Sequence, residues 1–290
     1  MPPDINPPLK NIYLFAVDLE DVRFWMEDGL KHEERLPLMA EKYLAFLEEH
    51  NCKATFFVVG DVARAYPGLI RKIAESGHEV ASHSNVHIQL DKQNPKIFKE
   101  EVIKSMNALH DAGVEKIYGF RAPNFSIIDK TSWAYEILEE LNFVYSSSVF
   151  PTKSVLYGWP EFGRKVKLID NKIWELPMTL FKSKLVSFPI AGGIYMRLLP
   201  FFFTRWSIKR CWKKGEPVLG YFHPYDIDTG QEHFMHPGVF NNKIYNELMY
   251  VNRGSLLKKA GKVIKMGGTI TTYIDYVRET LLHEKDNVLE

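Results

Sequence analysis

Short apolar segments alternate with amphipathic segments along the chain. The apolar segments are continuous hydrophobic runs of the kind found in buried parallel strands. We expect strands at residues 11–17, 54–59, 79–82, 118–120, 143–145, 173–176, 218–222 and 269–273. The spacing of apolar positions predicts helices at about 33–49, 67–76, 94–113 and 254–266. Strands that alternate with helices indicate βαβ units, and therefore an α/β fold with a mostly parallel sheet.

One segment departs from this alternation. Residues 156–176 read as a β-hairpin inserted into the fold, with Asp170 and Asn171 at its turn. The chain shows no internal repeat and no Gly/Ser-rich linker. We therefore predict a single domain over residues 1–290, with a core at about 11–276 and polar tails at 1–10 and 283–290.

Composition narrows the class of protein. The 290 residues carry a net charge of +1, which argues against nucleic acid as the main partner. The two cysteines, Cys52 and Cys211, are far apart, so neither a disulfide scaffold nor a cysteine-based metal site is expected. The first residues lack the pattern of a signal peptide, and no apolar run approaches the roughly 20 residues of a membrane span. These features predict a cytoplasmic protein.

Polar residues follow three of the predicted strands. An acidic cluster ends the first strand, His83 and His87 follow the third, and His223 follows the strand at 218–222. Active sites of α/β folds lie at such strand ends. Histidines at i and i+4 on one helical turn, together with a carboxylate, would hold one divalent metal. The alternatives are two unrelated histidines and a His223 with a purely structural role.

Four segments of the chain resemble the motifs of a known family. The segments ATFFVVG (54–60), GHEVASHSNVH (77–87), GFRAP (119–123) and YFHP (221–224) resemble the polysaccharide deacetylases, the NodB homology group of carbohydrate esterases. The resemblance covers about residues 11–276 and implies a distorted (β/α) barrel. The segments DLED (18–21), YSSS (145–148) and GGIYMRLLP (192–200) resemble the branch found in bacterial exopolysaccharide and surface-glycan loci.

The resemblance implies a metal site next to a catalytic base. Asp18 matches the family's base, and His83 and His87 match its metal-binding histidines. Glu20 is the matching third ligand, with Asp21 as the alternative, although a carboxylate at Asp21 also suits the N-terminus of a helix. The implied ion is Zn²⁺, with Co²⁺, Ni²⁺ or Fe²⁺ as alternatives.

The remaining catalytic roles follow from the same resemblance. Arg121 matches the arginine that holds the base, the backbone N–H of Asn124 occupies the position of the oxyanion donor, and His223 matches the general acid. The branch often has Asp where this chain has Ser146. Glu175 is a candidate to tune His223 in its place, or else a surface charge at a strand edge.

The implied activity is metal-dependent removal of an N-acetyl group from an amino sugar, or from a nucleotide- or lipid-linked precursor of a surface polysaccharide. A deformylase or another small-molecule amidohydrolase is the alternative within this chemistry, and a non-catalytic glycan-binding module is the alternative of another class. The oligomeric state is left open.

Several aromatic and histidine residues have two interpretations. Segment 198–214 mixes aromatic and basic residues and would suit peripheral contact with a membrane, but an ordinary amphipathic helix is the favoured interpretation. Candidates for sugar stacking, or for the core, are Tyr157, Trp159 and Tyr225. Of the remaining histidines, His78 is expected to be structural, whereas His233 and His236 are candidates to line the cleft.

Overall fold

The central element of the fold is strand β1 (Ile12–Leu19), in which every residue is buried. The computed structural model describes residues 9–154, 157–183, 186–239 and 241–282. Strand β1 pairs in parallel with β10 (Val218–Phe222) on one side, and with β2 (Thr55–Val58) and β11 (Thr269–Thr271) on the other. Its unbroken apolar sequence, IYLFAVDL, suits a strand that is covered on both faces.

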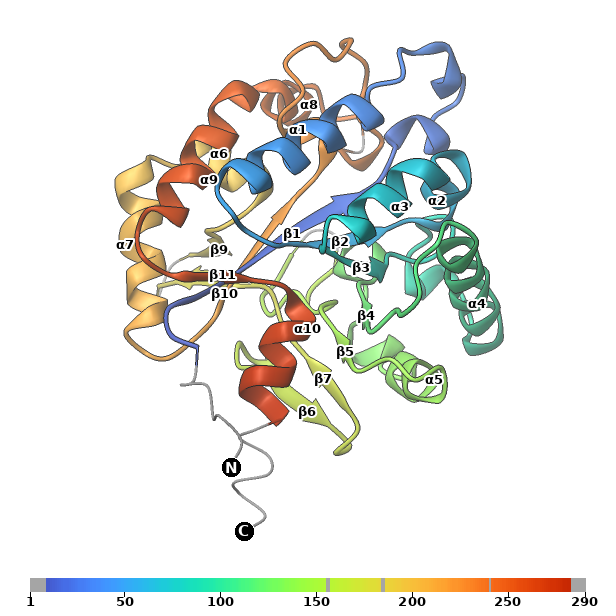
Figure 1. The fold of residues 1–290 in the computed structure, drawn as a ribbon. Coiled ribbons are helices and arrows are strands. Elements are labelled where there is room, and N and C mark those ends of the chain that lie inside the picture. Colours follow the sequence, from blue (N-terminus) through green and yellow to red (C-terminus); the bar gives the residue numbers. More distant parts are fainter. Residues whose placement is uncertain (1–8, 155–156, 184–185, 240, 283–290) are drawn as a thin grey trace.

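The main sheet is curled and has the order β10–β1–β2–β3–β4–β5–β7–β6, with β11 paired to β1 (Figure 1). All pairs are parallel except β6–β7. Its other strands are β3 (Glu79–Ser82), β4 (Gly119–Phe120), β5 (Tyr145–Ser146), β6 (Lys167–Ile169) and β7 (Ile173–Glu175). A separate hairpin consists of β8 (Leu180–Lys182) and β9 (Ser187–Pro189).

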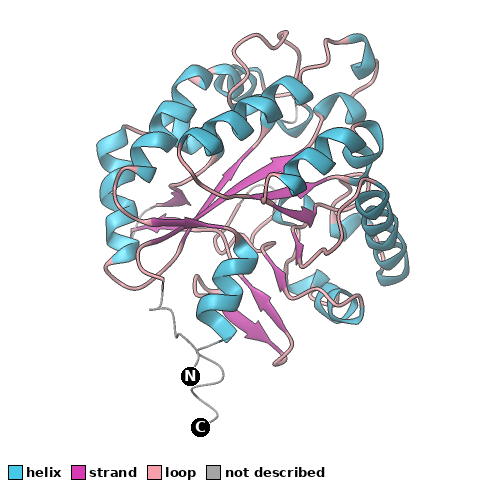
Figure 2. Ribbon diagram, viewed as in Figure 1, coloured by secondary structure: helices cyan, strands magenta, loops and turns pink. Residues whose placement is uncertain are grey.

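Helices surround this sheet (Figure 2). They are α1 (Leu36–Glu49), α2 (Gly60–Ala65), α3 (Pro67–Glu75), α4 (Pro95–Asp111), α5 (Ala134–Glu140), α6 (Gly193–Leu198), α7 (Phe201–Trp212), α8 (Lys243–Tyr250), α9 (Leu256–Ile264) and α10 (Tyr273–Tyr276). The start of α4 is typical: the Asn94 side chain accepts from the N–H of Ile97, and Pro95 opens the helix. Among the described residues, no helix combines the length and the apolarity needed to cross a membrane.

The predicted elements correspond closely to the observed ones. Every predicted strand has a counterpart, and the hairpin turns at Asp170 and Asn171 as β6 pairs with β7. Gly77, Gly113 and Gly267, which lie just after α3, α4 and α9, have positive φ angles, which glycine adopts without steric cost. The α/β prediction is confirmed. The tails at 1–8 and 283–290, and residue 156 at the start of the predicted hairpin, lie outside the described residues.

Two predictions require correction, and one element was not predicted. The strand expected at 269–273 ends at Thr271, because the Thr272 side chain caps helix α10 and Tyr273 begins that helix. The β8–β9 hairpin was not predicted, since its strands are only three residues long. His83 and His87 do not lie on a helical turn: the segment after β3 is irregular, and His87 has a φ of 54°.

The single-domain organisation stays a prediction, and the continuity of the sheet supports it. Strands β10 and β11 from the C-terminal half flank β1 from the N-terminal end. One large cluster of buried side chains extends from Tyr13 to Val263.

Candidate active site

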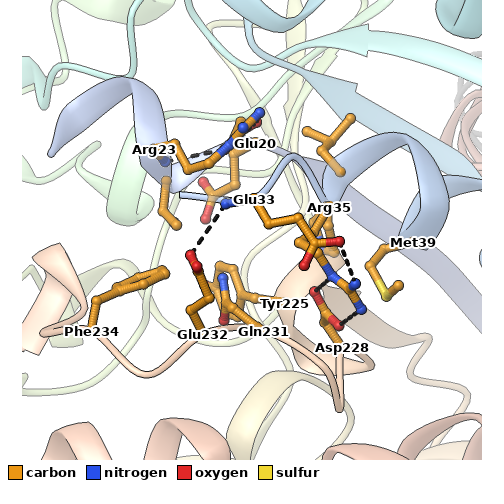
Figure 3. Close-up of a pocket in the computed structure, with 14 residues that line it drawn as sticks. Glu20, Arg23, Glu33, Arg35, Met39, Tyr225, Asp228, Gln231, Glu232 and Phe234 are labelled. Atoms are coloured by element: carbon orange, nitrogen blue, oxygen red, sulfur yellow. Dashed lines mark hydrogen bonds and ion pairs between the residues drawn. The ribbon is translucent and has the colours of Figure 1, made fainter. Parts of the chain in front are cut away.

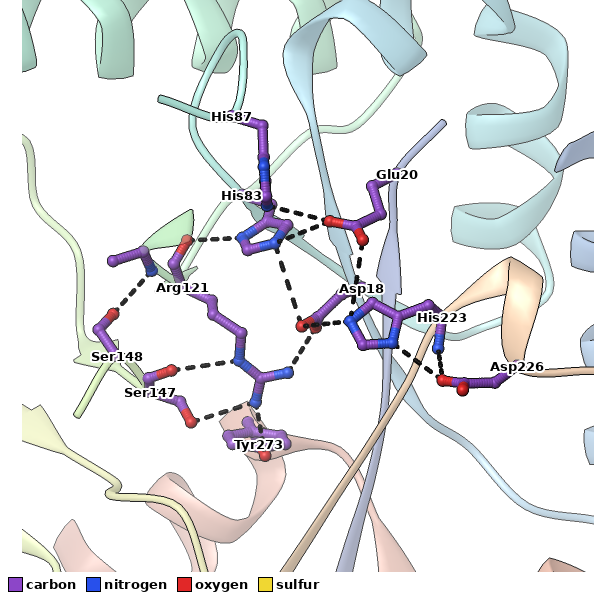
Figure 4. A network of polar contacts seen from close by, with 11 residues as sticks. Asp18, Glu20, His83, His87, Arg121, Ser147, Ser148, His223, Asp226 and Tyr273 are labelled. Carbon is purple, nitrogen blue, oxygen red and sulfur yellow. Dashed lines mark hydrogen bonds and ion pairs between the residues drawn. The ribbon is translucent and has the colours of Figure 1, made fainter. Parts of the chain in front are cut away.

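The sequence-predicted site residues meet at the carboxyl ends of the parallel strands. Asp18 is the last residue but one of strand β1, and Glu20 directly follows that strand. His83 follows β3, Arg121 follows β4, and His223 follows β10. Figure 4 shows these side chains directed toward one another. Parallel strands bring residues together in this way because their carboxyl ends share one edge of the sheet.

Glu20, His83 and His87 form the group that can hold a metal ion. Their ligand atoms all lie within 4.8 Å of one another. His87 Nε2 is 3.0 Å from Glu20 Oε2, and His83 Nε2 is 3.8 Å from the same oxygen. Burial alone would raise the pKa of Glu20, but the neighbouring histidines, His87 foremost, hold it well below its usual range. Glu20 is therefore an anionic donor beside two imidazoles.

The protonation of His83 suits a ligand. Its Nδ1 lies 2.8 Å from the carbonyl oxygen of Arg121, so Nδ1–H donates and Nε2 presents a lone pair to the cluster. Burial lowers the pKa of His83 to about 4, which keeps the ring neutral. The ring of His87 is held by stacking on Trp25, with ring centroids 4.0 Å apart. Two imidazoles and a carboxylate match the donor set of a catalytic divalent-metal site, so these residues fit the implied ion.

Asp18 is held by a fully buried arginine. Arg121 Nη1 donates to Asp18 Oδ1 at 2.5 Å, and its other nitrogens donate to the carbonyl and hydroxyl oxygens of Ser147 and to the Tyr273 hydroxyl. The guanidinium also lies 3.9 Å from the centroid of the Phe57 ring. Burial would lower the pKa of Arg121, but Asp18 raises it, so the guanidinium stays charged. This network fixes the direction of the Asp18 carboxylate.

His223 is held by Asp226, three residues further along the chain. The Asp226 Oδ2 atom lies 2.9 Å from both the Nδ1 and the backbone nitrogen of His223. On its far side, Asp226 Oδ1 is 3.1 Å from Nε of the buried Arg197. Burial alone would lower the pKa of His223, but Glu20 and Asp226 raise it to about 9. His223 is therefore protonated at neutral pH, and its Nε2 lies 4.0 Å from Asp18 Oδ2.

Sequence reasoning missed Asp226 and proposed Glu175 instead. Glu175 accepts hydrogen bonds from the backbone nitrogens of Ser148 and Val149 and from the Tyr135 hydroxyl, and it does not contact His223. Glu175 is also fully buried, so the alternative of a surface charge is wrong as well. The signal that would have found Asp226 is its place three residues after His223, which is the position that caps the turn following β10.

Asp21, the alternative ligand, points away from the histidines. Its carboxylate caps the 3-10 helix Val22–Trp25 and forms an ion pair with Arg23 at 2.7 Å. This side of the loop borders a second, polar cavity of about 30 Å³ (Figure 3). There Arg35 forms an ion pair with Asp228 at 2.7 Å, which ties the start of α1 to the segment after β10. Asp21 therefore stabilises the loop that carries Glu20.

The metal-ligating group opens into a cavity with a volume of about 410 Å³. Asn124, whose φ is 54°, lines this cavity together with His223. Seven aromatic side chains share its wall: Trp25, Phe125, Phe150, Tyr157, Tyr195, Tyr221 and Tyr225. Aromatic faces with a few polar groups are typical of a site that binds a sugar-sized ligand.

The other candidates divide between cavity and scaffold. Tyr157 and His236 line the cavity, and burial lowers the pKa of His236 to about 4. Trp159 packs on Phe162 instead. His78 accepts from the backbone N–H of Ala54, as a structural histidine would. The remaining candidate, His233, stacks on Tyr250 at a centroid distance of 3.9 Å.

Fold and site together define an α/β protein with a buried His/Glu cluster at its strand ends, and comparison with known families agrees with this class. Residues 26–145 match the family model described as polysaccharide deacetylase. Residues 147–266 match the model described as a domain of unknown function, DUF3473. The first of these segments therefore resembles the polysaccharide deacetylase family.

Curated relatives match only part of the chain. A peptidoglycan-N-acetylglucosamine deacetylase from Bacillus cereus is 32% identical over 96 residues, which are 33% of this chain and 35% of the relative. A chitooligosaccharide deacetylase from Sinorhizobium fredii is 35% identical over 88 residues, or 30% of this chain and 41% of the relative. The matches therefore span less than half of the length of either relative.

Solved structures resemble the chain over nearly its full length. A protein assigned to the polysaccharide deacetylases from Mycobacterium smegmatis has a TM-score of 0.67 at 19% identity, and the likeness covers 97% of this chain and 93% of that one. A CE4 family pseudoenzyme from Bacillus anthracis has a TM-score of 0.53 at 13% identity, covering 94% of this chain and 67% of that one. At these identities the likeness shows the fold alone.

Proposed function

We propose that the protein is a metal-dependent hydrolase that removes an N-acetyl group from an amino sugar. The observation that carries this proposal is the convergence of three units on one cavity: the Glu20, His83 and His87 cluster, the Asp18–Arg121 pair, and the His223–Asp226 pair. Binding a glycan requires neither a buried carboxylate held by an arginine nor a cationic histidine, so their presence together favours catalysis.

Glu20, His83 and His87 would hold the ion, for which Zn²⁺ suits a site with two imidazoles and one carboxylate. A divalent ion bound there supplies Lewis acidity toward water and toward the acyl oxygen of the substrate. Three protein ligands leave room for that chemistry, whereas a closed four-ligand site would be structural.

Asp18 is proposed as the general base. Its Oδ1 accepts a hydrogen bond from Arg121, and its Oδ2 lies 4.0 Å from His83 Nε2, so it borders the place where water would react. Arg121 binds Asp18 through Oδ1 only, so Oδ2 faces the cavity. This oxygen is positioned to take a proton.

His223 is proposed as the general acid. Its ring is cationic at neutral pH, and Nε2 is directed at the cluster while Nδ1 is held by Asp226. A proton on Nε2 can pass to the departing amine nitrogen when the C–N bond breaks. The backbone N–H of Asn124 is proposed to stabilise the developing oxyanion, a role that requires a fixed donor beside the reacting carbonyl.

The substrate proposal combines the cavity with the names of the relatives. Those names specify peptidoglycan-N-acetylglucosamine and chitooligosaccharides, which are acetamido sugars. We propose a surface-polysaccharide sugar, or a nucleotide- or lipid-linked precursor of it, as the substrate. Residues from both matched segments line the one cavity, for example His83 from the first and Tyr195 from the second. The second segment would therefore contribute to the choice of sugar.

Metal content and acyl release test the proposal together. Purified wild type should contain about one equivalent of divalent metal, and His83→Ala/His87→Ala should lose it. His78→Ala is the matched control, because His78 lies away from the cluster. Acetate and formate release are then measured on acetamido and formamido sugars, with Asp18→Asn as the variant that keeps the ligands and loses about 10²–10⁴ in rate.

The outcomes separate the candidate functions. Acetate release that depends on Asp18 supports the deacetylase. Release of formate alone would indicate a deformylase. Undiminished activity of Asp18→Asn would refute the assigned mechanism. Metal binding without turnover of any substrate, combined with glycan binding, would indicate the non-catalytic module.

A further inference from the structure

Helix α7 has two exposed aromatic side chains on the face that points away from the core. Phe202 is 75% exposed and Trp206 is 49% exposed, one helical turn apart. The opposite face of the helix makes the core contacts, through Ile208, Cys211 and Trp212. Burying large aromatic side chains is favourable, so a helix that places two of them in water indicates a surface with a further contact.

The same face is cationic. Arg205, Lys209 and Arg210 are exposed beside the two aromatic side chains, and they form no ion pair within the described part of the chain. Residues 176–215 contain eight Lys and Arg and no Asp or Glu, although the whole chain is nearly neutral at +1. The positive charge of this segment is therefore local and is not offset by neighbours in the sequence.

Aromatic contacts connect this face to the cavity. The Trp206 ring lies 5.7 Å from that of Phe203, and Phe203 lies 6.0 Å from Phe188 on strand β9. Phe188 in turn stacks on Tyr195 at 6.1 Å, and Tyr195 lines the cavity that holds the metal-ligating group. A continuous apolar ridge thus leads from the exposed face to the proposed active site.

We propose that the exposed face of α7, defined by Phe202, Arg205, Trp206, Lys209 and Arg210, docks on an anionic lipid surface. Exposed aromatic side chains insert at the boundary between headgroups and acyl chains, while the cations meet the negative headgroups. Docking in this way places the ridge, and the cavity at its end, beside the membrane.

A lipid surface explains the two features together. A nucleic acid would engage the cations, but the overall charge of +1 lacks the basic surplus of such proteins. A second copy of the chain would bring the same cations face to face and repel. Ile97 on α4, 45% exposed, differs from this face because charges of both signs lie near it in sequence, Lys96 and Lys99 together with Glu100 and Glu101.

Vesicle co-sedimentation tests this docking without any turnover, so its result is independent of the proposed deacetylation. We expect wild type to sediment with vesicles containing phosphatidylglycerol, to bind pure phosphatidylcholine vesicles at least about tenfold more weakly, and to lose binding at high salt. Arg205→Gln/Lys209→Gln should weaken binding by about fivefold for each cation removed. Phe202→Ala should weaken it by about tenfold or more.

Matched variants elsewhere on the surface serve as controls. Lys42→Gln/Lys96→Gln removes two exposed lysines on α1 and α4, and Ile97→Ala removes an exposed apolar side chain. These variants should bind vesicles as wild type does, and thermal unfolding should show that every variant is folded.

Three results would overturn the proposal. One is the absence of preference for anionic vesicles in wild type. Another is equal loss of binding in the control variants. The third is a protein that does not bind vesicles but binds single-stranded DNA, or that self-associates in a way that Phe202→Ala abolishes.

Discussion

The contact between Asp226 and His223 makes a prediction about the pH dependence of activity. His223 faces Glu20 and Asp18 at 3.8 and 4.0 Å, but Asp226 is nearer, with its Oδ2 at 2.9 Å from Nδ1. These carboxylates overcome the effect of burial and raise the pKa of His223 to about 9. Replacing Asp226 by Asn removes the closest negative charge and keeps the shape. In this variant the positive charge of Arg197 loses its partner, and it also disfavours a proton on His223. The pKa of His223 must therefore fall.

The size of the change follows from the hydrogen bond that is lost. A hydrogen bond to a charged group contributes about 1.5–3 kcal/mol. One pKa unit corresponds to about 1.4 kcal/mol, so the pKa of His223 should fall by about 1–2 units. A general acid works only while protonated, and the alkaline limb of the rate profile should move to lower pH by the same amount. At pH 8.5 the protonated fraction, and with it the rate, should fall roughly 3- to 25-fold.

The assay is kcat/KM for acetate release between pH 6 and 10, for wild type and Asp226→Asn with the same metal. Asp228→Asn is the matched control: this carboxylate is also buried and lies two residues along, but it pairs with Arg35. The control should keep the wild-type alkaline limb. An alkaline limb of Asp226→Asn that coincides with wild type, or moves to higher pH, would refute the role of His223 as a general acid held by Asp226.

Three further predictions concern the scaffold. Arg121→Leu should lower the free energy of unfolding by about 3–5 kcal/mol, since it leaves Asp18 buried without its partner, and urea unfolding that matches wild type would contradict this. Burial raises the pKa of Glu79 to about 7, so folding takes up a proton at this carboxyl group. The free energy of unfolding should therefore decline as pH rises from about 4.5 to 7, by at most about 3 kcal/mol. In Glu79→Gln that decline should be absent, and an unchanged pH dependence of unfolding would show that another group is responsible. Leu138→Ala removes a fully buried side chain on α5 and should lower the free energy of unfolding in urea by about 2–5 kcal/mol, because the cavity stays empty. A loss below about 1 kcal/mol would mean that the site collapses around the smaller side chain.

Much of the scaffold was predictable from the sequence because buried parallel strands leave a clear pattern. The apolar runs at β1, β3 and β10 gave their positions to within two residues, and the polar residues that follow them had to share one edge of the sheet. Short strands such as β8 and β9 carry too few residues for a periodic signal.

The residue types of the site were thus determined by the sequence: a carboxylate at the end of β1, two histidines after β3, an arginine after β4 and a histidine after β10. Tertiary structure alone decided which carboxylates act together. Glu20 and Asp21 are adjacent in sequence, yet the backbone of the loop directs one to the histidines and the other to Arg23. Such choices depend on loop dihedral angles and on partners distant in the chain, neither of which is encoded in local spacing.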